Sequence, residues 1–229
     1  MKVANFCQHS FLENYISRSS CVVDCGVNHG EFSSSVSHKW GCTIHGLEPD
    51  PRFFPNLPKL DKCTFHQLAL ADKEGSMTLN LGQLQCSSLY YKESNVENHC
   101  LVETISLPEF CRVNNIEKID LLKLDVEGAE LAVLDHLSDE FLVNRISQIT
   151  VEFHEFLDPT VVPRIKGIIR KLKRLGFYCL IFSRTYGDVL FVNGGFIRLS
   201  SLAKLDMLFT KYERGFFRIA KRLTSRADK

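Results

Sequence analysis

The chain has 229 residues, of which 45% are hydrophobic and 24% charged, as expected for a soluble globular protein with one sizeable core. The formal net charge of +1 argues against a dedicated nucleic-acid-binding protein, because such proteins carry a basic footprint. Nine cysteines without a CxxC pair argue against a zinc ribbon and favour a reducing compartment. We therefore expect a cytoplasmic protein without a signal peptide or transmembrane helix.

Short apolar stretches and helical patterns follow one another along the chain. Strands are predicted over residues 21–26, 43–49, 63–70, 119–126 and 146–156, and helices over 31–40, 128–137 and 160–176. Two further strands, 177–183 and 188–193, are joined only by the residues RTYG, which requires an antiparallel hairpin. The pattern predicts one α/β domain over residues 1–229, a Rossmann-like three-layer sandwich. Its mostly parallel sheet would end in the hairpin and bind ligands at the carboxyl ends of its strands.

Residues 75–100 interrupt this alternation. Within them, SMTLNL alternates between apolar and polar side chains, which is typical of a half-buried strand. We interpret the segment as strands or a lid beside the ligand site.

The first predicted strand leads into a glycine-containing turn, in the stretch VVDCGVNHG. Asp24 can accept hydrogen bonds from an ammonium or hydroxyl group, Gly26 allows a tight turn, and Asn28 and Gly30 lead into the next helix. A dinucleotide-binding turn would contain G-x-G-x-x-G, whereas this stretch has G-x-x-x-G. The stretch can therefore be a ligand-binding turn of another kind, a dinucleotide-binding turn that departs from the usual pattern, or a tight turn that binds no ligand.

The second predicted strand ends at Glu48, which is placed to accept hydrogen bonds from both hydroxyls of a ribose. This feature suits NAD and S-adenosylmethionine equally, because both contain adenosine, and a surface glutamate is the simpler alternative. Together with the acidic turn at Asp24, it favours S-adenosylmethionine.

The stretch IDLLKLDVEGAELAVLDHL places Asp125 at a strand end, Glu127 in the turn and Gly128 at the bend. Glu130 follows in the first helical turn, where an acidic residue also favours the helix dipole. Two carboxylates at a ligand crevice, Asp125 and Glu127, are costly unless a cation, a proton or donor groups meet them.

This block, together with VVDCGVNHGEFS, HGLEPDP and ALADKEGSMTL, resembles the FkbM family of S-adenosylmethionine-dependent methyltransferases over about Val22 to Glu152. The resemblance implies a class I methyltransferase fold and O-methylation of a hydroxyl on a sugar, lipid or other small molecule. It also assigns the cofactor contacts: the methionine end to Asp24, Gly26, Asn28 and Gly30, the ribose to Glu48, and the adenine to Ala71 and Asp72. The sequence departs from the family pattern at Val27 and Pro108.

An aliphatic hydroxyl needs help to lose its proton, so a general base or a metal is expected at the strand ends. The candidate catalytic residues are Asp125, Glu127 and His154, with Glu152 beside them. His154 is the more natural base by its ordinary pKa, although an exposed histidine without a role is an equal alternative. A hard divalent cation between Asp125, Glu152 and His154 is a further, weaker alternative.

Two other functions stay open: an NAD-dependent dehydrogenase and a non-catalytic cofactor-binding protein of methyltransferase ancestry. The expected partner is a small-molecule acceptor.

The C-terminal segment, residues 198–229, carries nine Lys or Arg against three Asp or Glu. Its apolar residues recur at spacings of three and four, which predicts a basic amphipathic helix; they are Leu202, Leu205, Leu208, Phe209, Tyr212, Phe216 and Ile219. We expect this helix to pack on the domain, with contact to an anionic membrane surface or a partner as the alternative.

Overall fold

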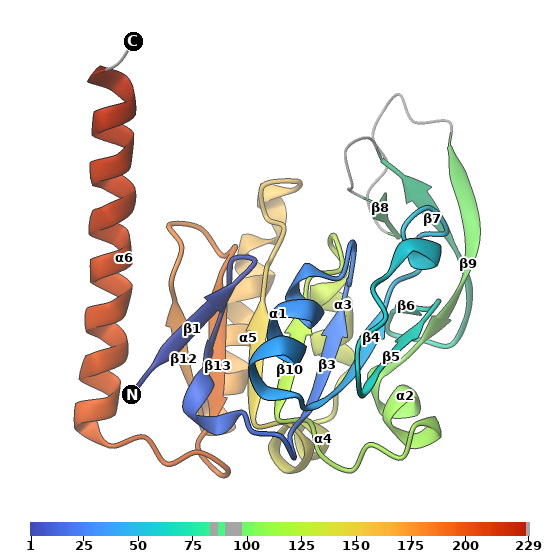
Figure 1. Ribbon diagram of the computed structural model, residues 1–229, viewed down its shortest axis with the longest axis horizontal. Helices are drawn as coiled ribbons and strands as arrows, with labels where there is room; N and C mark the ends of the chain where they lie inside the picture. The colour runs from blue at the N-terminus through green and yellow to red at the C-terminus, as the bar shows by residue number, and fades with distance from the viewer. Residues whose placement is uncertain (83–86, 90–97, 228–229) are drawn as a thin grey trace.

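The computed structural model describes residues 1–82, 87–89 and 98–227, and side chains up to residue 217. A seven-stranded sheet forms its centre (Figure 1), in the order β12 (Phe177–Ile181), β13 (Val189–Asn193), β11 (Gln148–Val151), β10 (Leu121–Leu124), β3 (Cys21–Cys25), β4 (Thr43–Leu47) and β5 (Cys63–His66). Strand β13 runs antiparallel to both of its neighbours, while the other pairs are parallel. The predicted mostly parallel sheet with a terminal antiparallel hairpin is confirmed.

Two apolar cores, one on each face of the sheet, make the three layers. One core packs α2 (Leu107–Val113), α3 (Glu130–His136), α4 (Asp139–Arg145) and α5 (Val162–Arg174) against the sheet. The other packs α1 (Glu31–Trp40), α6 (Ser201–Ala227) and an N-terminal hairpin against the opposite face. Short 3-10 turns lie at η1 (Glu13–Tyr15), η2 (Phe54–Asn56) and η3 (Pro159–Val161). None of the described helices is long and apolar enough to cross a bilayer.

The N-terminal hairpin, β1 (Val3–Phe6) and β2 (His9–Leu12), was not predicted. Its two-residue loop has positive φ at both Cys7 and Gln8, which is the geometry of a primed turn. The loop lacks the Asn or Gly that usually reveals such a turn in a sequence. Tertiary contacts hold it instead: the Leu12 N–H donates to Gln148 Oε1 at 2.7 Å.

A second, four-stranded sheet stands beside the carboxyl end of β4 (Figure 1). Its order is β6 (Ala69–Leu70), β9 (His99–Ile105), β7 (Gly75–Leu81) and β8 (Ser87–Ser88). The predicted strand 63–70 is therefore divided between two sheets, and the predicted strand at SMTLNL lies in β7. Of the predicted insert 75–100, residues 83–86 and 90–97 lie outside the described residues, so a lid there stays a prediction.

Candidate active site

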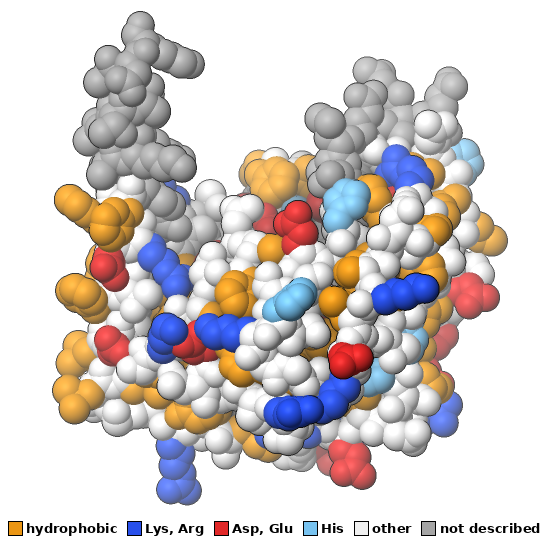
Figure 2. Space-filling view, in the orientation of Figure 1, with side chains coloured by type: hydrophobic (Ala, Val, Ile, Leu, Met, Phe, Trp, Pro, Cys, Tyr) orange, Lys and Arg blue, Asp and Glu red, His pale blue; other side chains and the backbone are white. Residues whose placement is uncertain are grey.

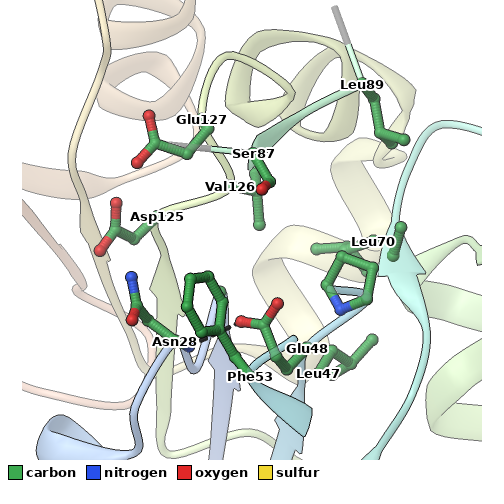
Figure 3. Close-up of a pocket in the computed structure, with 13 residues that line it drawn as sticks. Asn28, Leu47, Glu48, Phe53, Leu70, Ser87, Leu89, Asp125, Val126 and Glu127 are labelled. Atoms are coloured by element: carbon green, nitrogen blue, oxygen red, sulfur yellow. Dashed lines mark hydrogen bonds between the residues drawn. The ribbon is translucent and has the colours of Figure 1, made fainter. Parts of the chain in front are cut away.

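A pocket lies at the carboxyl ends of β3, β4 and β10 (Figure 3), the edge at which the sequence predicts ligand binding. Polar strand-end side chains line one part of it, and apolar side chains from β4, β6 and the loops after β4 and β8 line the other. The lining residues are Gly26, Asn28, Leu47, Glu48, Pro49, Phe53, Ala69, Leu70, Ser87, Leu89, Asp125, Val126 and Glu127. Five residues predicted from the sequence are thus brought together here: Gly26, Asn28, Glu48, Asp125 and Glu127.

Glu48 projects into the middle of the pocket from the end of β4 (Figure 3). Its carboxylate accepts hydrogen bonds from the Asn28 N–H at 2.6 Å and the Asp50 N–H at 2.9 Å. Burial nevertheless raises the pKa of Glu48 to about 7. The two backbone donors fix the orientation of the carboxylate and leave lone pairs for a ligand that offers two hydroxyl groups.

Asn28 lies in the turn after β3 with a left-handed φ of 54°. Its side-chain Oδ1 is buried and has no hydrogen-bond partner among the described residues. In Figure 3 the amide lies on the same side of the pocket as Asp125. A buried acceptor without a donor is rare in folded proteins, so this position favours a ligand that donates a hydrogen bond.

Gly26 and Gly30, both predicted as site residues, are required to be glycine for different physical reasons. A Cβ on Gly26 would lie 1.8 Å from the backbone oxygen of Asp125, so only glycine lets the two loops meet. A Cβ on Gly30 would lie 2.6 Å from Pro58 Cδ, and Gly30 does not line the pocket. The close contact that requires glycine at position 30 is thus with Pro58, and the contact with the cofactor that the resemblance implies for Gly30 stays a prediction.

Asp24 lies beneath the pocket and not in its lining. Its carboxylate is fully buried, accepts a hydrogen bond from Ser33 Oγ at 2.7 Å, and lies 3.1 Å from Lys123 Nζ. Lys123 sits opposite Asp24 on the neighbouring strand β10, and its ammonium also donates to the Gly26 oxygen at 2.8 Å. The ammonium that Asp24 was predicted to bind is thus supplied by the protein itself.

Two charged neighbours of Asp125, Lys123 and His9, were not among the residues predicted from the sequence. Lys123 Nζ lies 3.3 Å from Asp125 Oδ2, and His9 Nε2 lies 3.2 Å from the same oxygen. Burial alone would raise the pKa of Asp125, but Lys123, followed by His9, holds it well below its usual range. A lysine inside the apolar run IDLLKLDV was a visible signal, whereas nothing near His9 in the sequence indicated its role.

Glu130 holds the turn that carries Glu127. The backbone is left-handed at Glu127, with φ of 51°, and Glu130 accepts hydrogen bonds from the N–H groups of Val126 at 2.9 Å and Gly128 at 3.1 Å. The same carboxylate lies 3.0 Å from Nδ1 of His154, whose Nε2 lies 3.3 Å from Glu127 Oε2. A strained residue fixed by a buried carboxylate is typical of a functional turn.

His154 and Glu152 follow the end of β11 but differ in charge. Burial would lower the pKa of His154, but Glu130, Glu127 and Asp125 raise it to about 10, so the ring is protonated at neutral pH. Burial, followed by the charge of Asp125, raises the pKa of Glu152 to about 7. The charge state of His154 therefore conflicts with its predicted role as a base, and Glu152 has the more suitable pKa.

Two groups of side chains among the described residues could hold a metal ion: His9, Asp125 and Glu152, and separately Asp125, Glu127 and His154. Neither is the predicted set of Asp125, Glu152 and His154. Both depend on Asp125, next to which Lys123 already supplies a positive charge. A divalent cation stays the weaker alternative that it was in the sequence.

Ala71 and Asp72, predicted near the adenine, do not line the pocket. Ala71 is buried, and its N–H donates to the Ile105 oxygen at 3.0 Å. The preceding residues, Ala69 and Leu70 of β6, line the pocket instead. Strand β6, and not the turn after it, therefore contributes side chains to the pocket, and a contact of Ala71 and Asp72 with the adenine stays a prediction.

A model of the methyltransferase FkbM domain matches residues 24–179, which is more than half of the chain. The chain belongs to the FkbM methyltransferase family. The FkbM domain extends from β3 to β12 and includes every lining residue of the pocket. Family membership, and the position of the antiparallel β13 between β11 and β12, identify the class I methyltransferase fold.

Methyltransferase 1 of Beauveria bassiana (strain ARSEF 2860) is 30% identical to this FkbM chain over 148 residues. The match covers 53% of the chain and 59% of that relative. Among solved structures, a Methanococcus jannaschii fibrillarin is 15% identical with a TM-score of 0.44, over 77% of this chain and 66% of that one. An Aeropyrum pernix fibrillarin with natively bound S-adenosyl-L-methionine is 14% identical with a TM-score of 0.41, over the same shares.

Proposed function

We propose that the chain is an S-adenosylmethionine-dependent methyltransferase that methylates a hydroxyl group of a small molecule, with sugars and lipids as the acceptor classes. The main support for this proposal is the order of the apolar and polar side chains along the pocket. Leu47, Leu70 and Leu89 form its apolar end, Glu48 stands in the middle, and Asn28 and Asp125 form its polar end (Figure 3). This order matches an adenine, a ribose and a charged methionine moiety.

The residues present suit this cofactor. Glu48 can accept hydrogen bonds from both ribose hydroxyls, and Asn28 Oδ1, which has no partner in the described part of the chain, can accept one from the methionine ammonium. Asp125, held ionised by Lys123, supplies negative charge at the same end. When bound, S-adenosylmethionine would supply a methyl group on a positively charged sulfur leaving group. The dehydrogenase alternative has neither the G-x-G-x-x-G turn nor family support.

We assign the general base to Glu152. The group that accepts a hydroxyl proton should have a pKa near the working pH, and burial brings that of Glu152 to about 7. Protonated His154, held by Glu130, would keep the Glu127 turn in place and balance the charge of the acidic side chains around it.

The activity is tested by incubating the purified chain with isotope-labelled S-adenosylmethionine and a fractionated metabolite extract. Mass spectrometry should find a labelled product whose methyl group is attached to oxygen. A label on nitrogen would contradict the hydroxyl acceptor, and binding of S-adenosylmethionine without any product across the extract would favour the non-catalytic alternative.

Replacing Glu48 with glutamine is expected to weaken binding of S-adenosylhomocysteine about 10- to 100-fold. The reason is the loss of a charged acceptor for two hydroxyls, worth about 1.5–3 kcal/mol. Isothermal titration calorimetry measures the change. Glu103→Gln, at an exposed glutamate of β9, is the control and should bind like the wild type. Equal affinity in Glu48→Gln would remove Glu48 from the cofactor site.

The pH dependence of turnover tests the base. With S-adenosylmethionine saturating, kcat/KM for the acceptor should fall about tenfold per pH unit below pH 7, because Glu152 accepts a proton only when ionised. Glu152→Gln should lower the plateau at least about a hundredfold and abolish this acid limb. His154→Asn should keep the limb. If Glu152→Gln keeps both the wild-type rate above pH 7 and the decrease in rate below pH 7, another group is the base.

A further inference from the structure

The hairpin of β1 and β2 precedes residues 24–179, which the FkbM domain matches, and yet it reaches the candidate active site. The outer surface of this region carries charged side chains: Figure 2 shows Lys, Arg, Asp and Glu over the face that holds β1 and α1. Strand β2 lies beneath that surface and is fully buried, with no exposed area at His9, Ser10, Phe11 or Leu12. The side chain of His9 therefore lies inside the domain.

Polar side chains of the sheet hold the hairpin in one position. Asp188, directly before β13, accepts hydrogen bonds from the Ser10 N–H at 3.0 Å and from Ser10 Oγ at 2.7 Å. Gln148 of β11 accepts from the Leu12 N–H at 2.7 Å and donates to the Leu12 oxygen at 3.3 Å. These groups are buried, so a shifted hairpin would leave them unpaired at a cost in free energy. The hairpin is thus fixed relative to β11.

The ring of His9 is held on three sides. Nε2 lies 3.2 Å from Asp125 Oδ2, and Nδ1 lies 3.4 Å from Thr150 Oγ1. Phe32 packs against the ring in an edge-on contact, with 5.8 Å between the ring centres. Because a carboxylate only accepts hydrogen bonds, Nε2 must carry a proton, and the Thr150 hydroxyl can pair with Nδ1. These contacts fix the direction in which the Nε2–H group points.

The two carboxylate oxygens of Asp125 have different partners. Oδ2 is held by two groups, His9 Nε2 and, at 3.3 Å, Lys123 Nζ. Oδ1 forms no hydrogen bond within the described part of the chain, and His154 Nε2 lies 3.6 Å from it. The side chains of His9 and Lys123 are 0% and 3% exposed, whereas that of Asp125 is 26% exposed and lines the pocket. Oδ1 is therefore the oxygen that Asp125 can offer to a ligand.

We propose that His9 is a positioning residue of the cofactor site: it holds Oδ2 of Asp125, so that Oδ1 points to the ammonium group of bound S-adenosylmethionine. This role rests on the proposed function, in which Asp125 supplies negative charge to the methionine end of the cofactor. An acceptor that is fixed before the ligand arrives loses less conformational entropy on binding.

Lys123 directs the carboxylate of Asp125 less sharply than His9 does. Its ammonium is a compact charge with rotatable donors, and it also contacts Asp24 at 3.1 Å and the Gly26 oxygen at 2.8 Å. The imidazole of His9, in contrast, has a single N–H group that points to Asp125. Binding of the cofactor thus depends on a residue that lies outside the FkbM domain.

Calorimetric titration of the full chain with S-adenosylhomocysteine tests this role. His9→Leu keeps a similar volume and removes the hydrogen bond to Asp125, and should weaken binding about tenfold. His9→Gln, whose amide can donate from nearly the position of Nε2, should bind within about threefold of the wild type. His38→Leu, at an exposed histidine of α1, is the matched control and should bind like the wild type.

Equal affinity of His9→Leu and the wild type would overturn the positioning role. A wild type that does not bind S-adenosylhomocysteine would instead contradict the proposed function, and this role with it.

Two further variants separate positioning from a general weakening of the fold. Ser10→Ala removes a buried hydrogen bond of the same strand and should lower the melting temperature without changing the affinity. In an Asp125→Ala background, titrated up to millimolar ligand, His9→Leu should change the affinity less than about twofold, because the carboxylate on which it acts is gone. A tenfold loss in both backgrounds, or an equal loss in Ser10→Ala, would show that His9 acts through folding and would contradict the proposal.

Discussion

Replacing Asp125 with asparagine is expected to lower kcat/KM about a hundredfold while the fold is kept. Asp125 lines the polar end of the pocket and is kept ionised by Lys123 and His9. The substitution keeps the shape of the side chain and removes the charge, and a hydrogen bond to a charged group is worth about 1.5–3 kcal/mol. Labelled methyl transfer to the acceptor found by mass spectrometry measures the loss.

Asp135→Asn is the control for Asp125→Asn, because Asp135 forms an exposed ion pair with Arg164 far from the lining residues. It should leave kcat/KM unchanged. The proposed role of Asp125 fails if Asp125→Asn transfers methyl groups as fast as this control. Near-wild-type melting of both variants separates lost chemistry from lost folding.

Replacing Lys123 with methionine is expected to lower the free energy of unfolding by about 3–5 kcal/mol, because it leaves the carboxylates beside it without their cation. Lys123 is 3% exposed and lies between Asp24, which is fully buried, and Asp125. Methionine fills much of the same volume, so the missing charge should dominate the effect. Equilibrium unfolding in urea measures the change.

Lys118→Met is the control, since Lys118 is an exposed lysine paired with the half-buried Asp120, and this substitution should cost less than about 1 kcal/mol. The double variant Lys123→Met/Asp24→Asn should recover part of the stability lost in Lys123→Met. If the double variant is no more stable than the single one, the cost comes from packing and not from the unpaired Asp24.

The sequence alone was sufficient for the sheet and for part of the pocket. Apolar runs that end in Asp24, Glu48 and Asp125 mark adjacent parallel strands, and such strands bring their carboxyl ends to one edge. Local patterns also determined α1, over the predicted residues 31–40, and the hairpin of β12 and β13. These features could be predicted because each depends on periodicity or loop length within a few residues.

Only the tertiary structure decided which side chains meet and in what charge state. The β1–β2 hairpin brings His9 to Asp125, 116 residues later in the chain, and its turn has no local signal. Pairing of β3 with β10 places Lys123 opposite Asp24. Asp24, which the sequence suggested as an acceptor for the ammonium of a ligand, therefore forms a buried ion pair with a lysine of the protein. His154 appeared in the sequence as a base with an ordinary pKa, but three surrounding carboxylates raise its pKa to about 10. Burial and the distances between charges determine a pKa, and both arise only when distant segments pack together.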